Sequence, residues 1–350
     1  MPGVRPDVNT MNLEQRTAPR ASEARLDSLR EEARQNGRLS DPGMTIVAGP
    51  IPRQPAAGVG YYGQPIVKPP VWTWQIGLYL FVGGTAGMSA VLALAALVTG
   101  RPRQLVSAAL TVALSGAIIS PLLLIWDLGR PARFLNMLRV FKWRSAMSVG
   151  VWTLLVFSTF AGTAFLAVEG AGILREAGVP TLLARGAIFA LVLGTALSGV
   201  VLATYTGVLL GATAVPAWSA HHVLLPFHFG IVGLGSAAAV LELLGFRLAA
   251  LNTLGLMAAA IETGIGAWIE LNRRGPTARA LHEGRAGFLL RAAGLLTGPV
   301  AFILRATGLV TVAAVCFLLG AVTSRYGWIF AGRFSAGDPE ETIARQRLTS

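Results

Sequence analysis

Long apolar stretches separated by short polar links fill the chain from about residue 72 onward. A helix needs roughly 20 mainly apolar residues to cross the hydrocarbon core of a bilayer. The pattern therefore predicts an all-α integral membrane protein, with about eight transmembrane helices in a bundle and a polar N-terminal extension. The predicted spans cover residues 72–98, 105–126, 148–169, 184–213, 221–244, 250–270, 287–304 and 307–323.

The seventh predicted span is the least regular of the eight. Residues 287–304 are apolar, but they contain Arg291 and a Gly298-Pro299 step that favours a break in the helix. If this segment crosses the membrane, the two termini of the chain lie on the same side. If it is re-entrant or interfacial, they lie on opposite sides.

The same pattern divides the chain into three parts. Residues 1–70 are polar and rich in Arg, Glu, Pro and Gly, which predicts a largely irregular extension that can lie on a partner. We find in them no basic segment followed by an apolar one, the mark of a cleavable signal peptide. Residues 71–330 form the predicted transmembrane helix bundle, and residues 331–350 form a C-terminal tail.

Composition supports a membrane location. Apolar residues make up 53% of the 350 positions and charged residues 13%, whereas about a quarter of the residues of a soluble domain are charged. The net charge of +12 comes from Arg and Lys in loops beside the spans, where these side chains meet lipid headgroups and set orientation. We therefore expect membrane lipid, and no nucleic acid, as a partner.

The distribution of basic residues also bears on orientation. Loops on the side where the chain enters the first span carry more Lys and Arg than loops on the opposite side. Such an excess is typical of the cytoplasmic side. We expect a multi-pass protein of the cell's inner (cytoplasmic) membrane with a cytoplasmic N-terminus.

The chain offers few ligands for a metal. Cys316 is its one cysteine, and it has four histidines. An iron–sulfur cluster usually needs four cysteine ligands, and a haem held by two histidines needs them on different helices. We expect this chain to bind neither metal nor haem by itself.

Several polar residues are predicted to lie at one side of the membrane when the spans are counted alternately. Tyr79 lies in the first span, Asp127 at the end of the second, Tyr205 in the fourth, and His221 and His222 at the start of the fifth. The rise of a helix puts Tyr79 roughly 10 Å and Tyr205 roughly 13 Å inside the membrane face. Such a group is a candidate site, although interfacial histidines often act only as polar caps.

Asp127 has two interpretations. A carboxylate at the C-terminal end of a helix is unfavourable unless a cation or ligand compensates it. A salt bridge to Arg130 or Arg133 would close the following loop, and the functional alternative is a role in accepting protons.

Three carboxylates lie inside the later spans, where ionisable groups are costly and indicate function by default. In the order Glu270, Glu262 and Glu242 they suggest a proton route that starts on the side of the tyrosines and crosses the bilayer. The alternative is that each acid pairs with an arginine or a backbone group inside the bundle.

One loop carries a resemblance to a known family. The run from Asp127 to Arg139, followed by Arg144-Ser145-Ala-Met147-Ser148 and Trp152, resembles the signature loop of NrfD/polysulfide-reductase-type membrane subunits. Three further segments agree with it, and together they span residues 72–339: Tyr79 with Gly83-Gly84, Tyr205 to Gly207 with Val215 to Trp218, and Arg325 to Pro339.

The resemblance implies the membrane anchor subunit of a multi-subunit respiratory oxidoreductase, which is not catalytic alone. Such a subunit exchanges electrons between a quinone, either menaquinone or ubiquinone, and a ferredoxin-like [4Fe–4S] subunit. A catalytic subunit, often a molybdopterin enzyme or a multihaem cytochrome, would complete the complex. Since a quinone that takes two electrons also takes two protons, proton uptake or translocation can accompany the reaction.

The resemblance also suggests roles for individual residues. A quinone carbonyl needs hydrogen-bond donors that can be reprotonated. The predicted quinone-binding residues are Tyr79, Asp127, Arg130, Tyr205 and His222, and the predicted proton-transfer residues are Asp127 and Glu262.

Two other functions remain open on the sequence. A secondary transporter also has many spans and buried acids, and it predicts internal repeats and unwound segments at mid-bilayer; the sequence shows no clear repeat. A purely structural anchor would leave Tyr79, Asp127 and Tyr205 dispensable.

Overall fold

The computed structural model describes residues 28, 31, 66–128, 138–273, 275 and 277–347, without the side chains at 174, 175 and 344–347. The chain divides into two compact units, residues 1–59 and 60–350. Most of the predicted N-terminal extension, residues 1–70, falls outside the described residues. The second unit contains all the spanning helices and is described here by itself.

Eight helical segments in the described part of the chain are long and apolar enough to cross a membrane. The prediction of an all-α membrane protein with about eight spans is confirmed. The segments are α3 (Trp74–Val98), α4 (Arg103–Asp127), α6 (Ala146–Glu169), α8 (Thr181–Gly211), α10 (Leu224–Leu243), α11 (Ala249–Leu271), the segment Gly284–Ala306, and α15 (Val310–Gly337). Short helices α7 (Ala171–Glu176), α9 (Pro216–Ala220), α12 (Ala278–His282) and α16 (Pro339–Arg347) lie between or after them.

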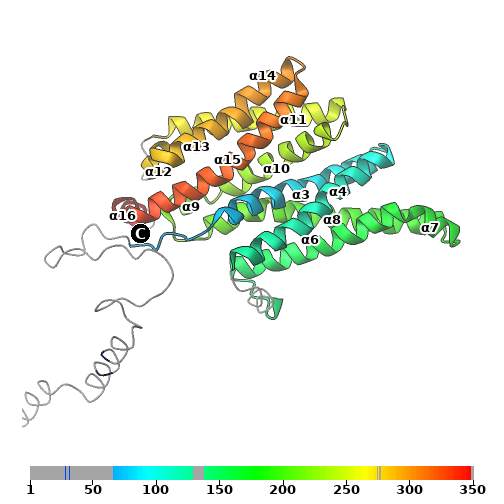
Figure 1. Ribbon diagram of the computed structural model, residues 1–350, viewed down its shortest axis with the longest axis horizontal. Coiled ribbons are helices and arrows are strands. Elements are labelled where there is room, and N and C mark those ends of the chain that lie inside the picture. The colour runs from blue at the N-terminus through cyan, green and yellow to red at the C-terminus, as the bar shows by residue number, and fades with distance from the viewer. Residues whose placement is uncertain are drawn as a thin grey trace, which may run out of the picture. The chain divides into compact units, whose positions relative to one another are not determined.

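The seventh span is one broken helix. It consists of α13 (Gly284–Leu295), a π-helical turn η1 (Leu296–Val300) and α14 (Ala301–Ala306). The break falls at the Gly298-Pro299 step, where Gly298 leaves helical geometry with φ −96° and ψ −109° and proline has no N–H to donate. The segment is long enough to cross the membrane in full, so α3 begins and α15 ends on the same side, as Figure 1 shows.

The eight spans form two groups of four. In the first half, α3, α4, α6 and α8 pack on one another; in the second half, α10, α11, the α13–α14 segment and α15 do the same (Figure 1). Helices α3 and α8 contact α10, and α3 also contacts α15, which joins the halves. We call the end of the bundle at which α3 begins and α4 ends the Asp127 end.

Glycine allows the closest helix contact in the first half. A Cβ atom on Gly87 of α3 would overlap the backbone carbonyl of Gly199 on α8, and a Cβ atom on Gly199 would overlap the carbonyl of Gly87. Small residues that let two backbones meet are a main source of helix association in lipid. The glycines of α3 therefore have a packing role, with Gly87 as the point of contact.

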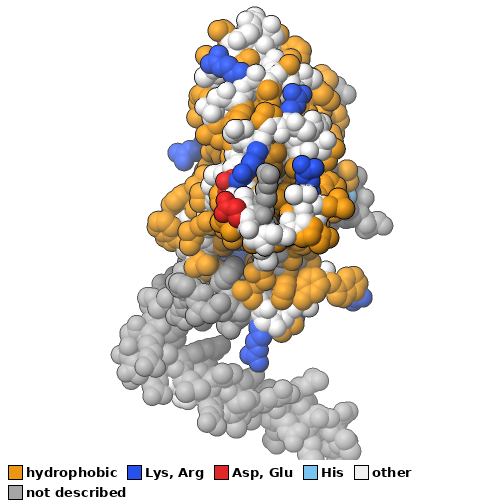
Figure 2. All heavy atoms as spheres, turned by 90° about the vertical axis from the view of Figure 1, so that its right-hand side faces the viewer, with side chains coloured by type: hydrophobic (Ala, Val, Ile, Leu, Met, Phe, Trp, Pro, Cys, Tyr) orange, Lys and Arg blue, Asp and Glu red, His pale blue; other side chains and the backbone are white. Residues whose placement is uncertain are grey.

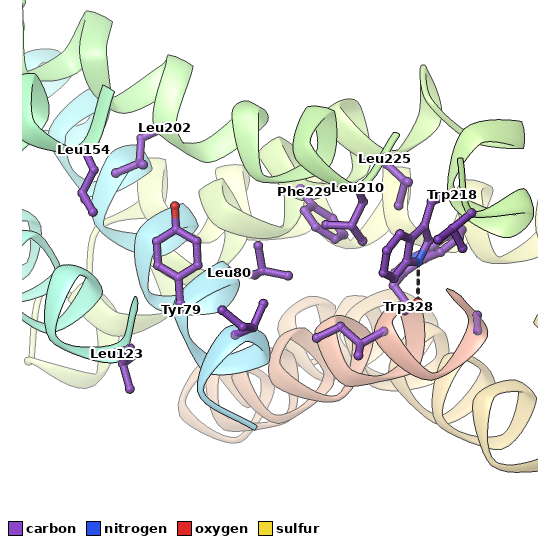
Figure 3. Close-up of a cluster of buried hydrophobic side chains, with 14 of the residues drawn as sticks. Tyr79, Leu80, Leu123, Leu154, Leu202, Leu210, Trp218, Leu225, Phe229 and Trp328 are labelled. Carbon is purple, nitrogen blue, oxygen red and sulfur yellow. Dashed lines mark hydrogen bonds between the residues drawn. The ribbon is translucent and has the colours of Figure 1, made fainter. Parts of the chain in front are cut away.

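An aromatic core crosses the junction between the halves. Trp218 of α9 donates its indole N–H to the carbonyl oxygen of Trp328 on α15 at 2.7 Å, and both side chains are buried (Figure 3). Phe229 and Leu80 lie in the same cluster. This core holds α9 against the end of α15, which extends to Gly337 and so passes the predicted boundary at residue 330.

The outer surface of the bundle is largely apolar. Figure 2 views the end at which α7 lies, opposite the Asp127 end, and hydrophobic side chains cover much of the described surface there. Leu182 is 81% exposed and Ile173 is 72% exposed. Large exposed apolar surfaces are rare on soluble proteins, and lipid accommodates these side chains.

Candidate functional site

A pocket of about 120 Å³ lies among the first four spanning helices at the Asp127 end. Tyr79, Asp127 and Tyr205 line it, together with the apolar side chains of Trp72, Ile76, Met147 and Val151. We call it the tyrosine pocket. The structure thus brings together three residues that the sequence spreads over three helices.

Tyr79 is the most buried of the three polar residues, at 2% exposed. Its side chain extends from α3 toward α8, near Leu202 (Figure 3). Among the described residues, none forms a hydrogen bond with its hydroxyl. Buried hydroxyl groups usually have partners, and the Tyr79 side chain lines the pocket, so its hydroxyl is suited to donate to a polar ligand atom.

Tyr205 has a fixed orientation. Its hydroxyl donates a hydrogen bond to the carbonyl oxygen of Ala146 at the start of α6, and its ring packs over Gly150, where a Cβ atom would overlap it. Because the hydroxyl hydrogen is already donated, the oxygen faces a ligand as an acceptor. Tyr79 and Tyr205 therefore offer opposite hydrogen-bonding characters.

Asp127 joins the ends of α3 and α4. Its carboxylate accepts hydrogen bonds from the backbone N–H of Thr73, at 3.4 Å, and from the Thr73 hydroxyl. Thr73 is the residue before α3, so the acid that is unfavourable at the end of α4 lies at the favourable N-terminal end of α3. Both arginines predicted as its partners, Arg130 and Arg133, lie outside the described residues.

The predicted histidine does not line the tyrosine pocket. His222 is exposed, and its Nδ1 lies 3.0 Å from the carbonyl oxygen of Ser219 in its own turn. The neighbouring His221 ring packs against Trp328 and Trp268. The site that the structure assembles consists of Tyr79, Tyr205 and Asp127.

A second polar group lies in the second half, and Glu262 is the one member of it for which the sequence predicted a role. His228 of α10 contacts the Glu262 carboxylate of α11 through Nδ1 at 3.0 Å and the Ser324 hydroxyl of α15 through Nε2 at 2.8 Å. All three side chains are buried. A histidine deep in an apolar span was the sequence signal for this group, because ionisable residues in spans need partners.

The other two acids of the hypothetical route have arginine partners. Glu242 and Arg305 form a buried bidentate salt bridge, with both N···O distances at 2.7 Å. Glu270 accepts a hydrogen bond from Arg291 Nε at 2.8 Å. The alternative for these acids was pairing inside the bundle. It applies to Glu242 in particular, because both of its carboxylate oxygens bind the guanidinium group of Arg305.

Arg325 is a further buried cation near this group. Its guanidinium carbon lies 3.6 Å from the centre of the Phe229 ring, and one of its nitrogens donates to the Phe229 carbonyl oxygen at 3.2 Å. Its Nε and second terminal nitrogen have no hydrogen-bond partner among the described residues. Within the residues that the structure describes, no group of three or more His, Cys, Asp and Glu side chains is arranged to hold a metal ion.

Comparisons with known proteins identify the family. A comparison with curated proteins finds no match. Residues 65–272 match the family model described as polysulphide reductase, NrfD. The match covers more than half of the chain, takes in the first six spanning helices and includes every residue of the tyrosine pocket. The chain therefore belongs to the NrfD family of polysulphide-reductase-type proteins, which are membrane subunits of respiratory oxidoreductases.

Proposed function

We propose that this chain is the quinone-reactive membrane subunit of its complex and that the tyrosine pocket binds the headgroup of menaquinone or ubiquinone. The observation that carries the proposal is the convergence of Tyr79, Tyr205 and Asp127 on one pocket at one end of the bundle. Membership of a family of oxidoreductase membrane subunits supports it.

The pocket suits a ring with oxygen substituents. Its walls are apolar, and its volume of about 120 Å³ is the size of a headgroup rather than of a molecule with an isoprenoid tail. Tyr79 has a hydroxyl hydrogen to donate to a carbonyl oxygen, and Tyr205 has an oxygen that accepts from a hydroxyl group. The two tyrosines can therefore bind both the oxidised and the reduced form of one ring.

Asp127 has the position of a proton carrier. It lies at the end of α4, beyond the two tyrosines in the direction of the aqueous phase, and the Thr73 hydroxyl binds its carboxylate. A quinone supplies two-electron, two-proton redox chemistry when it is bound. The carboxylate can accept a proton from water and pass it inward, which is the role of a general acid–base group.

Electrons must pass between this pocket and a separate subunit, because one cysteine cannot hold an iron–sulfur cluster. We expect the ferredoxin-like [4Fe–4S] subunit to bind at the Asp127 end, with the catalytic subunit, a molybdopterin enzyme or a multihaem cytochrome, beyond it. Exposed aromatic side chains between α4 and α6, Phe141 and Trp143, support a partner surface there. The excess of loop Arg and Lys at this end favours the cytoplasmic side of the inner membrane.

The transporter alternative has one observation in its favour. The break at η1 is an unwound segment inside a span, as a transporter predicts. Among the described helices it occurs in the second half alone, without a matching break in α3, α4, α6 or α8. A substrate site built on paired broken helices is therefore not supported.

The test is the change of Tyr79 to Phe in the purified complex. Loss of the free hydroxyl should lower quinone-dependent electron transfer roughly 100-fold, the usual contribution of one general acid or base. Tyr326→Phe is the matched control, because Tyr326 donates its hydroxyl to the Trp74 carbonyl at the same end and does not line the pocket. Equal turnover of the two variants would contradict the proposed site and favour a structural anchor.

A further inference from the structure

A larger cavity lies in the second half of the bundle, separate from the tyrosine pocket. It has a volume of about 390 Å³ and is enclosed by α11, α13, η1 and α15. We call it the α11–α13 cavity. Small-molecule sites in proteins are commonly about 300–1,000 Å³ and mainly apolar, with a few polar groups that fix orientation. This cavity has both properties.

The inner end of the cavity is polar and buried. His228, Glu262 and Ser324 line it there and form one hydrogen-bonded chain through the two nitrogens of His228. Glu262 is 2% exposed and uses its Oε1 atom in this chain. Within the described residues its Oε2 atom has no hydrogen-bond partner. A ligand hydroxyl that reached this end would find an acceptor in Glu262 Oε2. Because His228 donates its Nδ1–H to the carboxylate, its Nε2 accepts from the Ser324 hydroxyl, whose oxygen is a second acceptor for the ligand.

The end of the cavity near the membrane face is closed by an ion pair. Glu270 of α11 and Arg291 of α13 both line the cavity, and they are bonded at 2.8 Å. Arg291 also donates to the carbonyl oxygen of His282. Both of these charged groups are already neutralised, so neither is free to bind a charged headgroup.

The side of the cavity opens between two glycines. Gly266 of α11 and Gly294 of α13 line it, and a Cβ atom on either would meet no other atom within 4 Å. Ala267 and Leu295, beside them, also line the cavity and are exposed. Since both glycines lie inside spanning helices, the opening faces the lipid.

We propose that the α11–α13 cavity is a second quinone site, entered from the bilayer, with the headgroup at the His228–Glu262–Ser324 chain and the isoprenoid tail leaving between Gly266 and Gly294. The ligand must be neutral, because the inner end has a carboxylate and no free cation among the residues that line it. It must also be amphiphilic, because the entrance lies in the membrane. A phospholipid meets the second condition but not the first, because its phosphate group is charged even where the whole headgroup is zwitterionic.

The choice of a quinone among neutral amphiphiles rests on the proposed function, since quinone is the lipid-soluble substrate of this complex. The cavity itself rests on geometry alone. A second site of this kind would hold a reserve quinone molecule within the same subunit, in the half of the bundle that does not contain the tyrosine pocket. The two sites share none of their lining residues.

The test is photolabelling of the intact complex in lipid nanodiscs with a ring-azido ubiquinone analogue, followed by mass spectrometry of the labelled peptides. We expect label on peptides of α11 or α13 as well as on peptides of α3 or α8. Gly294→Leu fills the opening and should reduce label on α11 and α13 at least fivefold, with label at the tyrosine pocket unchanged. Gly266→Leu should have the same effect from the facing helix.

Gly264→Leu is the matched control. Gly264 lies two residues before Gly266 on α11 and does not line the cavity. It is exposed, and a Cβ atom there would meet open space. It should leave both labels unchanged. Retained label at the tyrosine pocket shows that each variant is folded.

The outcomes separate the two proposals. Label at the tyrosine pocket alone, label on α11 and α13 that Gly294→Leu does not reduce, or a phospholipid recovered from the cavity by native mass spectrometry would each overturn the second site. Label at neither place would overturn it together with the proposed function. Label on α11 or α13 alone, sensitive to Gly294→Leu, would support this cavity and count against the tyrosine pocket.

Discussion

The first four spanning helices and the last four differ in where their ionisable side chains lie. In the first half, charged residues occur only near helix ends: Arg103, Asp127, Glu169 and Arg185. In the second half, five ionisable side chains are buried: His228, Glu262 and Arg325 inside the helices, and Glu242 and Arg305 one residue before the ends of α10 and α14. Both halves lie in the same bilayer, so the solvent does not explain the difference.

The difference shows two ways to build a polar site in a membrane. The site in the first half uses neutral hydroxyl groups, and its one carboxylate, Asp127, lies at the end of a helix, where water is near. The second half buries charges and stabilises them by pairing, because an unpaired charge in hydrocarbon is strongly unfavourable. Removal of one partner should therefore be far more costly in the second half.

The largest effect is expected at the Glu242–Arg305 pair. Arg305→Met leaves the Glu242 carboxylate buried without its partner, and we expect a loss of stability of about 3–5 kcal/mol, the usual cost of breaking a buried ion pair from one side. Thermal unfolding of the purified protein in detergent measures the loss.

The double variant Glu242→Gln/Arg305→Met is the control. It removes both charges together, so it should be more stable than Arg305→Met alone, although two side chains are altered. If the double variant were the less stable of the two, the pair would not hold a buried charge in place, and the comparison of the halves would fail.

A smaller effect is expected at the helix contact of the first half. Gly87→Ala puts a methyl group against the Gly199 backbone, and overpacking costs about 1–3 kcal/mol. We expect about 3 kcal/mol, because a backbone cannot move aside as a side chain can. The same unfolding measurement checks it.

Gly186→Ala is the control for this contact. Gly186 lies on α8, the helix of Gly199, but a Cβ atom there meets no other atom within 4 Å. Alanine favours a helix over glycine, so this variant should be as stable as the parent chain or slightly more stable. Equal losses at Gly87 and Gly186 would mean that close packing does not hold the first half together.

The smallest effect is a pH dependence outside the spans. Burial raises the pKa of Glu341 on α16 to about 7, and the nearby Asp338 and Glu283 carboxylates also raise it, while the Ala280 N–H and Arg279 act in the opposite direction. A raised pKa means that the folded state favours the neutral acid. Stability is therefore fully present below about pH 4.5 and is lost as the pH rises to about 7.

Hydrogen exchange of α16, corrected for intrinsic rates, should detect this loss. We expect docking of α16 on α12 to weaken by about 1–2 kcal/mol between pH 5 and pH 8, because tenfold in an ionisation constant corresponds to about 1.4 kcal/mol. Glu341→Gln should remove the pH dependence, and Glu340→Gln, at an exposed neighbour, should retain it. Persistence of the dependence in Glu341→Gln would assign it to another group.

The sequence predicted the spans well because hydropathy is a local property of about 20 residues. It left the seventh span open, because Arg291 and the Gly298-Pro299 step count against a spanning helix. The partner of Arg291, Glu270, lies on another helix, and so does Glu242, the partner of Arg305. The reason the helix is tolerated in lipid is thus a tertiary contact that no window of sequence contains.

The sequence predicted which residues meet in the candidate site, but it did not predict the contacts that they make. Alternation of spans brings Tyr79, Tyr205 and Asp127 to one end without knowledge of any contact. The partner of Asp127 could not be found in this way, because Thr73 lies 54 residues earlier and threonine before a helix is common. His228 was overlooked as a partner for Glu262, 34 residues later, because the two lie on different helices.

The Arg305–Glu242 pair also has a consequence for biosynthesis. Arginines add to the cost of insertion by the translocon. The seventh span carries Arg291 and, one residue before its end, Arg305, and it has a proline break besides. Glu242 precedes Arg305 by 63 residues, so α10 leaves the ribosome first. We therefore expect the seventh span to enter the bilayer late and against α10, with the carboxylate of an already inserted helix as the receptor for its charge.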